Sequence, residues 1–183
     1  WRGMVRRALF AMPALLMQDL SIVGMFAGPD LDRCAAPTGI DVRCLADWHR
    51  VIRTNLSGCF YLCKAVLPHM LKYNYGRIIN ISSVIGLSGN IGQANYASAK
   101  AGLFGFTKTL ALETARKGIT VNAVAPGFVR TEMTDKIPPE IVEKILDQIP
   151  MRRFAEPHEI SRVVIFLAQE DSAYITGQIY GIN

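Results

Sequence analysis

Short apolar runs alternate with longer amphipathic segments through most of this chain, and this alternation constrains the fold more than any other feature. The apolar runs have the length and β-branched content of buried strands and cover residues 77–82, 119–124 and 178–182. The segments with helical spacing of apolar residues cover residues 47–74, 96–117, 138–148 and 157–168. Alternating strands and helices predict an α/β protein with a doubly wound, Rossmann-like parallel sheet that is covered on both faces.

Residues suited to a binding site follow two of the predicted strands directly. Ser83 comes after the run at 77–82, and Pro126 with Gly127 comes after the run at 119–124. Ligands of parallel sheets bind at the carboxyl ends of the strands. We therefore expect a site at this edge of the sheet.

Tyr96 and Lys100 lie four residues apart on a predicted helix and follow Ser83 by thirteen positions or more. Residues i and i+4 share one face of a helix, so the phenol and the ammonium are neighbours. A neighbouring cation makes a phenol easier to ionise. The three side chains could surround one carbonyl oxygen. Each also has an ordinary explanation: an interface tyrosine, a solvated lysine and a serine that caps a turn.

Two further motifs complete a family pattern, namely Thr54-Asn55-Leu56-Ser57-Gly58 and the stretch 122–131. With them the chain resembles the short-chain dehydrogenase/reductase family, and within it the 3-oxoacyl-[acyl-carrier-protein] and acetoacetyl-CoA reductases. The resemblance covers residues 45–183. It implies transfer of a hydride from a reduced nicotinamide to a carbonyl carbon, with four catalytic residues: Asn55, Ser83, Tyr96 and Lys100.

The resemblance also implies the role of each residue. Tyr96 would donate the proton, Ser83 would orient the substrate oxygen, and Asn55 would hold a water that links Lys100 to solvent. Tyr96 and Lys100 would also contact the cofactor, which is expected to be NADPH, with NADH not excluded. The other residues expected at the cofactor are Pro126, Gly127, Val129 and Thr131. The residues expected at the substrate are Ser83, Gln93 and Tyr96.

The implied substrate is a 3-oxoacyl thioester carried by acyl carrier protein or coenzyme A, which would be reduced to the 3-hydroxyacyl thioester. The resemblance also implies that the two long helices at 47–74 and 96–117 form the subunit interface of a homotetramer or homodimer. Acetoacetyl-CoA reductase or another short-chain alcohol dehydrogenase is an alternative. A second alternative is an inactive fragment or paralogue that acts only through subunit association.

The leading segment 1–44 departs from the family pattern, since it has no Gly-rich dinucleotide turn. Only Ala27 and Gly28 match the expected Asn-Asn-Ala-Gly turn. We therefore divide the chain into residues 1–44, a remnant or misread part of the nucleotide-binding half, and residues 45–183, the catalytic two-thirds of one domain. The sheet is accordingly expected to be an N-terminally incomplete three-layer sandwich.

Composition and residue spacing also indicate which partners, metal sites and cellular location to expect. The net charge of +5 is spread along the chain without a basic stripe, so no nucleic-acid partner is expected. No apolar run has the length of a membrane span. The four cysteines form no Cys-x-x-Cys pair and the three histidines are scattered, so we expect no metal site and a reducing, cytoplasmic location. Residues 1–17 are basic and then apolar, like a targeting peptide, although Pro13 interrupts the run.

Overall fold

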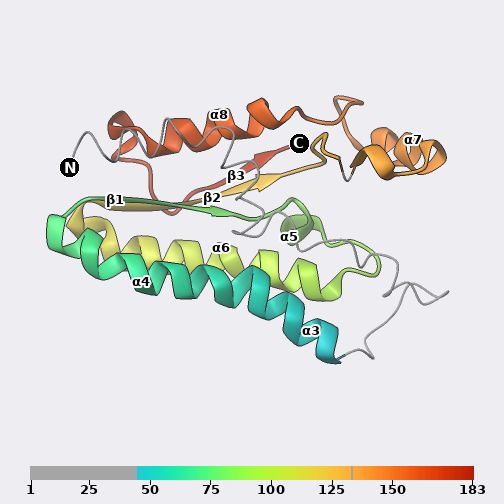
Figure 1. Cartoon of the computed structure of the whole chain (residues 1–183). Coiled ribbons are helices and arrows are strands. Elements are labelled where there is room, and N and C mark those ends of the chain that lie inside the picture. Colours follow the sequence, from blue (N-terminus) through green and yellow to red (C-terminus); the bar gives the residue numbers. More distant parts are fainter. Residues whose placement is uncertain (1–44, 133) are drawn as a thin grey trace.

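The computed structural model describes residues 45–132 and 134–183 (Figure 1), so the predicted segment 1–44 lies outside the described part of the chain. Three parallel strands form a sheet in the order β1-β2-β3. Their bounds are Gly76–Ile81 for β1, Ile119–Pro126 for β2 and Ile179–Ile182 for β3. The predicted parallel α/β sheet is confirmed, and the strand ends differ from the predicted ones by one or two residues.

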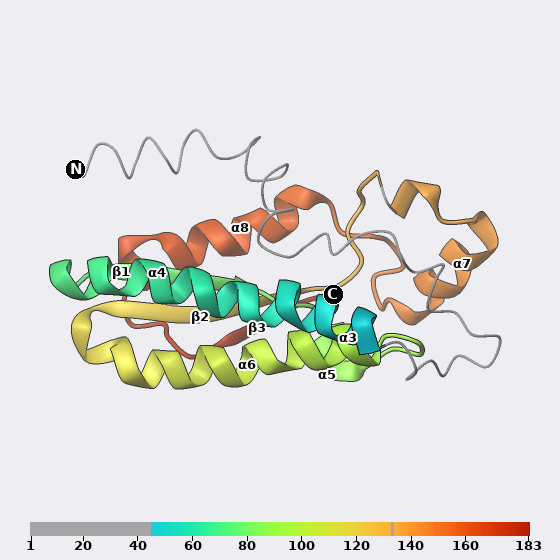
Figure 2. The ribbon, with the colours of Figure 1, turned by 60° about the horizontal axis from the view of Figure 1, so that its bottom comes forward.

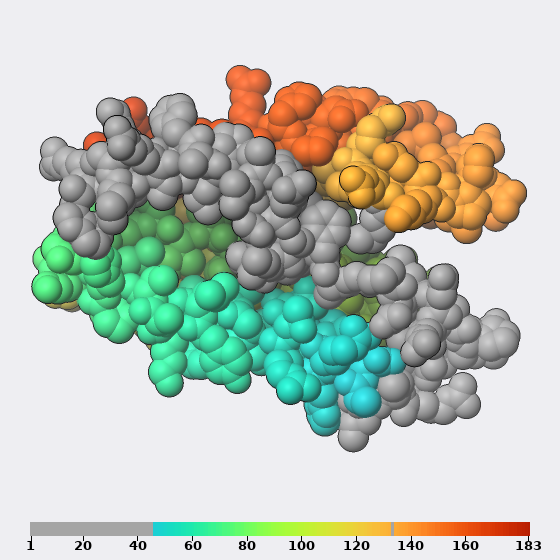
Figure 3. Space-filling view, in the orientation of Figure 1, coloured from blue at the N-terminus to red at the C-terminus, as the bar shows by residue number. Residues whose placement is uncertain are grey.

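Helices cover both faces of the sheet, as Figures 1 and 2 show from two directions. The helices on one face are α3 (Leu45–Ile52), α4 (Gly58–Tyr73) and α6 (Ala94–Thr114). The opposite face carries α8 (Pro157–Ala168). In the space-filling view, α3 and α4 form one side of the molecule and α7 (Pro139–Gln148) lies with α8 on the other (Figure 3). The short helix α5 (Ile85–Ser88) follows β1 at the carboxyl edge of the sheet.

The central strand β2 is buried along all eight of its residues, as expected for a parallel strand covered on both faces. One apolar cluster lies between the sheet and the helices α4 and α6, and consists of Cys63, Ile78, Leu110, Ala111, Ile119 and Val121. The second lies between the sheet and α8, and consists of Ile81, Val124, Val129, Ile160 and Leu167. Cys59 and Cys63 are buried free thiols, as predicted.

The first long helix is not continuous, although the sequence predicted one helix over 47–74. A π-helical turn at Arg53–Ser57 joins α3 to α4, and the Gly58 N–H donates to the Arg53 carbonyl. Such turns are rare and are frequent at functional sites. This one buries Asn55 completely. It also packs Leu56 against α6 at Gly102, where an added Cβ would lie 2.9 Å from the Leu56 side chain.

The two long helices end together at the amino edge of the sheet. Asn74 closes α4 in the left-handed conformation with φ 48°. A short 3-10 turn after α6 ends at Gly118, with φ 64°, as the sequence predicted. An added Cβ on Gly118 would lie 2.6 Å from the Asn74 carbonyl oxygen, so only glycine fits this approach. The contact helps to set Gly76 opposite Ile119 at the start of the β1–β2 register.

Candidate active site

Ser83 lies directly after β1 and is held there by main-chain bonds to the neighbouring strand. The Ser82 N–H donates to the Val124 carbonyl at 2.7 Å, and the Val84 N–H donates to the Pro126 carbonyl at 3.0 Å. Ser83 is buried, and its hydroxyl oxygen accepts from the Ile85 N–H at 3.2 Å at the start of α5. The serine hydroxyl is therefore fixed at the carboxyl edge of the sheet.

Tyr96 and Lys100 reach the same place from the first turns of α6. The phenol of Tyr96 lies close enough to the Ser83 side chain for the serine to lower the pKa of Tyr96. The Lys100 ammonium donates to the Ile81 carbonyl at 3.0 Å and lies 5.5 Å from the centre of the Tyr96 ring. Lys100 has no solvent exposure. The structure thus brings a serine, a tyrosine and a buried lysine together at the end of β1.

Burial dominates the acid–base properties of this group. It lowers the pKa of Lys100 from 10.5 to about 8, and the nearby Cys59 thiol opposes part of that change. Burial also raises the pKa of Tyr96, and the nearby Ser83 side chain offsets only part of this increase. In this structure burial outweighs the polar contacts of the phenol. The expectation that the adjacent ammonium makes the phenol easier to ionise stays a prediction.

Asn55 lies in the π-helical turn and has no solvent exposure. Its side-chain N–H donates to the Val51 carbonyl at 3.1 Å. Its side-chain oxygen has no hydrogen-bond partner in the described part of the chain. In that part, every other buried polar side-chain atom has a partner. A buried acceptor without a partner is unfavourable by about 1–3 kcal/mol, and such atoms often mark a bound water or a functional role.

The carboxyl end of β2 contributes Pro126 and Gly127. Pro126 is the last residue of the strand, and the Gly127 N–H donates to the Ile182 carbonyl at 2.7 Å. An added Cβ on Gly127 would lie 3.0 Å from the Asn183 Cβ and 3.3 Å from the Ile182 carbonyl oxygen. A side chain at position 127 would therefore be tightly packed against Ile182 and Asn183.

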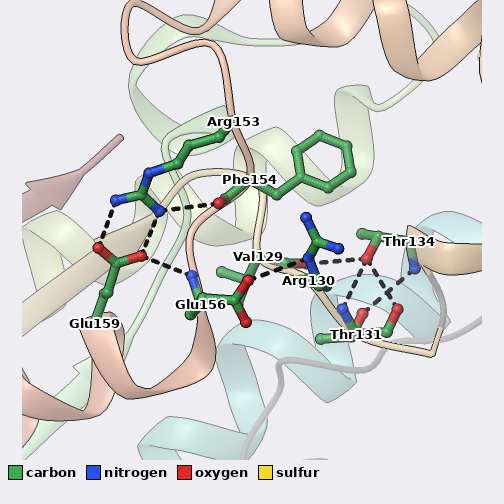
Figure 4. A network of polar contacts seen from close by, with 8 residues as sticks. All are labelled: Val129, Arg130, Thr131, Thr134, Arg153, Phe154, Glu156 and Glu159. Carbon is green, nitrogen blue, oxygen red and sulfur yellow. Dashed lines mark hydrogen bonds and ion pairs between the residues drawn. The ribbon is translucent and has the colours of Figure 1, made fainter.

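Val129 and Thr131 continue this edge beyond β2. Val129 is buried and forms an isolated parallel bridge with Ala155. The Thr131 N–H donates to the Thr134 hydroxyl at 2.7 Å, and the Thr131 hydroxyl accepts from the Thr134 N–H at 3.4 Å (Figure 4). The second bond is long, so the Thr131 hydroxyl keeps most of its capacity to bind another group.

Gln93 precedes the first turn of α6 and adopts a non-helical conformation there. Its side-chain oxygen accepts from the Asn90 amide at 3.1 Å, within the turn that connects α5 to α6. The structure places Gln93 three residues before Tyr96 on the same side of the sheet. Its side chain is already engaged in that turn.

Three polar contacts near the site had no role in the sequence analysis. The Cys59 thiol donates to the Asn55 carbonyl at 3.6 Å, and the Ser82 hydroxyl donates to the Lys100 carbonyl at 2.8 Å. Cys59 is four residues after Asn55, a helical spacing that could have indicated the first contact. The partner of Ser82 is eighteen residues away, so no local pattern indicates it.

The third contact is an ion-pair network at the start of α8. Arg153 makes two bonds of 2.6 Å to the Glu159 carboxylate, which also accepts from the Glu156 N–H at 2.8 Å (Figure 4). Glu156 in turn lies 3.2 Å from the Arg130 guanidinium. The Glu156-Pro157-His158-Glu159 spacing has the form of a capping box and could have been identified from the sequence. The network ties the segment after α7 to the loop after β2.

Two classes of site have no support in the described residues. None of their helices is both long and apolar enough to cross a bilayer. In the same part of the chain, no three His, Cys, Asp or Glu side chains lie together so that they could hold a metal ion.

Known proteins resemble the chain over most of its length. Residues 37–183 match a family model described as enoyl-(acyl carrier protein) reductase. A 3-oxoacyl-[acyl-carrier-protein] reductase of Thermotoga maritima is 50% identical over 137 residues, which are 75% of this chain and 56% of that protein. The Escherichia coli reductase of that description is 52% identical over 137 residues, with the same coverage. The Rickettsia felis reductase is 45% identical over 161 residues, which are 85% of this chain and 67% of that protein. The chain thus spans little more than half the length of the first two relatives.

Proposed function

The chain belongs to the short-chain dehydrogenase/reductase family, and on that premise we propose that it carries the catalytic groups of a nicotinamide-dependent reductase of 3-oxoacyl thioesters. The product would be the 3-hydroxyacyl thioester. One observation carries the proposal: Ser83, Tyr96 and the fully buried Lys100 converge at the carboxyl end of β1. The names of the similar reductases support the same substrate class.

The donor set at this edge fits a nicotinamide cofactor. The hydroxyls of Tyr96 and Thr131 and the ammonium of Lys100 could form hydrogen bonds with the ribose hydroxyls and the carboxamide of the nicotinamide half. The turn at Pro126 and Gly127 adds main-chain groups at this edge of the sheet. The cofactor, when bound, would supply the hydride. We propose NADPH, which the resemblance to the 3-oxoacyl-[acyl-carrier-protein] reductases implies, and NADH is the alternative.

Tyr96 would donate a proton to the oxygen of the substrate carbonyl, which becomes an alkoxide. Its raised pKa keeps the proton on the phenol at neutral pH, so the residue starts in the acid form. Lys100, with a pKa of about 8, is about nine-tenths protonated at pH 7 and would stabilise the phenolate that remains. Ser83 would donate a second hydrogen bond to the same substrate oxygen.

Asn55 would supply the link between Lys100 and solvent. Its buried side-chain oxygen has no partner in the described part of the chain, which supports a bound water there. Such a water would return a proton to the Lys100–Tyr96 pair after each turnover.

Acyl carrier protein or coenzyme A is the proposed carrier, on the strength of the similar reductases. Three basic residues at the amino edge of the sheet could bind an acidic carrier, namely Lys72, Arg77 and Lys117. Arg77 donates to the Gly76 carbonyl at 2.9 Å and lies 4.9 Å from the Tyr75 ring, so it mainly supports the fold. At 1.5 Å per residue, Lys117 lies about 30 Å along the helix from Tyr96. A carrier bound at Lys117 would therefore need a long acyl arm to reach Tyr96 of the same chain. Otherwise it would deliver its substrate to the active site of another subunit.

We also propose a homotetramer or homodimer in which α4 and α6 form the contact. Large apolar residues on α4 are exposed, namely Phe60, Tyr61, Leu62, Val66, Leu71 and Tyr73. A groove between the two helices is lined by Phe60 of this set together with Leu67, Phe106 and Leu110. Exposed apolar area of this kind also favours the second candidate, a chain that acts only by associating with other subunits.

The buried free thiols Cys59 and Cys63 fit a reducing compartment such as the cytoplasm.

The test compares turnover of the chain with that of Tyr96→Phe, with acetoacetyl-CoA as the probe and NADPH absorbance as the signal. Loss of the acid should lower kcat by about 10²- to 10⁴-fold. Tyr174→Phe is the control, because that tyrosine is fully exposed on a loop. Unchanged turnover in Tyr96→Phe would remove the proposed acid. A folded chain with no turnover would favour the association-only function.

A further inference from the structure

Two adjacent serines follow β1, and the structure gives them different partners. The Ser83 hydroxyl accepts from the Ile85 N–H at 3.2 Å and lies near Tyr96, whose pKa it lowers. Ser82 is 2% exposed, and its hydroxyl donates to the main-chain carbonyl of Lys100 at 2.8 Å. The hydroxyl of Ser82 therefore contacts the helix that carries the proposed acid, rather than the space where a substrate would lie.

The connection between this strand end and α6 is reciprocal. The Lys100 ammonium donates to the Ile81 carbonyl at 3.0 Å, while Ser82 donates to the Lys100 carbonyl. One residue of the helix is thus bonded through both its main chain and its side chain to two consecutive residues of the strand end. An added Cβ on Gly86 of α5 would lie 2.8 Å from the Lys100 carbonyl carbon. Ser82 and α5 therefore both pack against the helix turn at the Lys100 carbonyl group.

We propose that Ser82 is a positioning residue, whose hydroxyl fixes the turn of α6 that carries Tyr96 and Lys100 against the end of β1. The kinetic consequence rests on the proposed function, whereas the positioning itself does not. The Lys100 carbonyl lies in the middle of α6 and keeps its intrahelical bond when Ser82 is changed, so the helix remains intact. Its placement against the strand becomes less restricted. A displacement of about 1 Å at a catalytic group can lower the rate by up to about 100-fold.

The same interface offers a matched control pair farther along the helix. The Asn80 side chain donates to the Thr107 hydroxyl at 2.9 Å, and both residues are buried. This bond also joins β1 to α6, about two turns from Lys100. Thr107→Val removes a buried strand–helix hydrogen bond of the same kind at a distance from the site.

The environment of Lys100 provides a readout that does not depend on turnover. Burial lowers the pKa of this amine to about 8, and among the described residues the titratable groups that face it include Tyr96 on its own helix and Cys59 on α4. A looser turn admits water to the ammonium, so the pKa of Lys100 should rise toward its ordinary value of 10.5. Competitive acetylation with acetic anhydride, followed by peptide mass spectrometry across a pH series, reports this midpoint for Lys100.

The experiment compares the chain with Ser82→Ala, Ser82→Cys and Thr107→Val, with folding checked by circular dichroism. We expect kcat for acetoacetyl-CoA to fall about tenfold in Ser82→Ala, with KM changed less than about twofold. The acetylation midpoint of Lys100 should rise in the same variant. Ser82→Cys keeps a weak donor of similar size and should recover part of both properties. Thr107→Val should lower Tm while kcat and the midpoint stay unchanged.

Three outcomes separate the possibilities. A midpoint in Ser82→Ala equal to that of the parent chain overturns the positioning role. So does an equal fall of kcat in Ser82→Ala and Thr107→Val, because general destabilisation would then explain both. If the parent chain is folded but reduces no thioester, the proposed function fails, and the acetylation midpoints still decide the role of Ser82. Should Ser82→Ala not fold, Ser82→Cys carries the same comparison.

Discussion

Replacing Lys100 by methionine should make the protein more stable while it removes the proposed activity. Lys100 is completely buried, and lowering its pKa from 10.5 to about 8 corresponds to about 3 kcal/mol of preference for the neutral amine. Near pH 7 the folded protein keeps the charge and bears this full unfavourable term. Methionine has a similar length without the charge. After subtraction of about 1 kcal/mol for the lost bond to the Ile81 carbonyl, we expect a gain of about 2 kcal/mol in the free energy of unfolding.

The pH dependence of stability gives an independent check. A folded state with the lower pKa binds fewer protons than the unfolded chain between about pH 8 and pH 10.5, so the free energy of unfolding rises with pH in that window. With these two pKa values, Lys100 contributes an increase of about 1.3 kcal/mol between about pH 7 and about pH 9. The increase should be absent in Lys100→Met. The buried thiols change stability in the opposite direction, because burial raises the pKa of Cys63 to about 11. Comparing the two proteins removes the contribution of Cys63, whereas that of Cys59 changes in Lys100→Met, because the Lys100 charge lowers the pKa of Cys59.

Urea unfolding followed by circular dichroism at the two pH values measures both quantities. Lys108→Met is the control, because Lys108 is exposed on the same helix and its replacement should change stability by less than about 0.5 kcal/mol. The reasoning would be refuted by a Lys100→Met variant that is no more stable than the parent chain near pH 7. It would also be refuted by an equal pH dependence in the two proteins.

Two further predictions concern the fold and its association. Gly118→Ala and Gly177→Ala both place a side chain at positive φ, which is unfavourable by about 1–2 kcal/mol in the left-handed helical region. The Cβ at position 118 would lie 2.6 Å from the Asn74 carbonyl oxygen, whereas the Cβ at position 177 would make an ordinary contact of 3.6 Å with the Ala111 Cβ. Gly118→Ala should therefore lower the urea midpoint clearly more than Gly177→Ala, and equal midpoints would contradict this packing. Phe60→Glu should lower the molar mass in light scattering, because Phe60 is 48% exposed among the apolar residues of α4. Tyr174→Glu on an exposed loop should leave the mass unchanged, and a parent chain that is already monomeric would rule out the proposed contact.

The fold was predictable where local signals were strong. The β-branched run at 119–124 gave the position of β2, and Gly118 gave the end of the preceding helix. The sequence missed that β2 extends to Pro126, because that residue pairs with Ile182 near the end of the chain. It also missed the π-helical turn at Arg53–Ser57, since one extra residue in a turn leaves the local apolar spacing almost unchanged.

The candidate site shows the same division between local and tertiary information. Ser83, Tyr96 and Lys100 were expected at one edge because each follows a predicted strand or lies at a helical spacing. The burial that raises the pKa of Tyr96 was not predictable, because sequence identifies a charged neighbour but does not give the depth of burial. The cause of the glycine at 127 was also not predictable, because the residue that approaches it is Asn183.

The unfavourable features of the described structure are concentrated around Lys100. The buried amide Asn122 is satisfied on both of its polar atoms, by the Ile175 carbonyl and the Gln178 N–H. Asn55, by contrast, is buried with a side-chain oxygen that lacks a partner in the described part of the chain, and it lies in a rare helical turn packed against α6. The fully buried ammonium of Lys100 lies on that same helix. Packing alone would favour an apolar side chain at both positions, since each buried polar group reduces the free energy of unfolding. Departures from local rules that gather at one place are expected where chemistry, rather than stability, determines the residues.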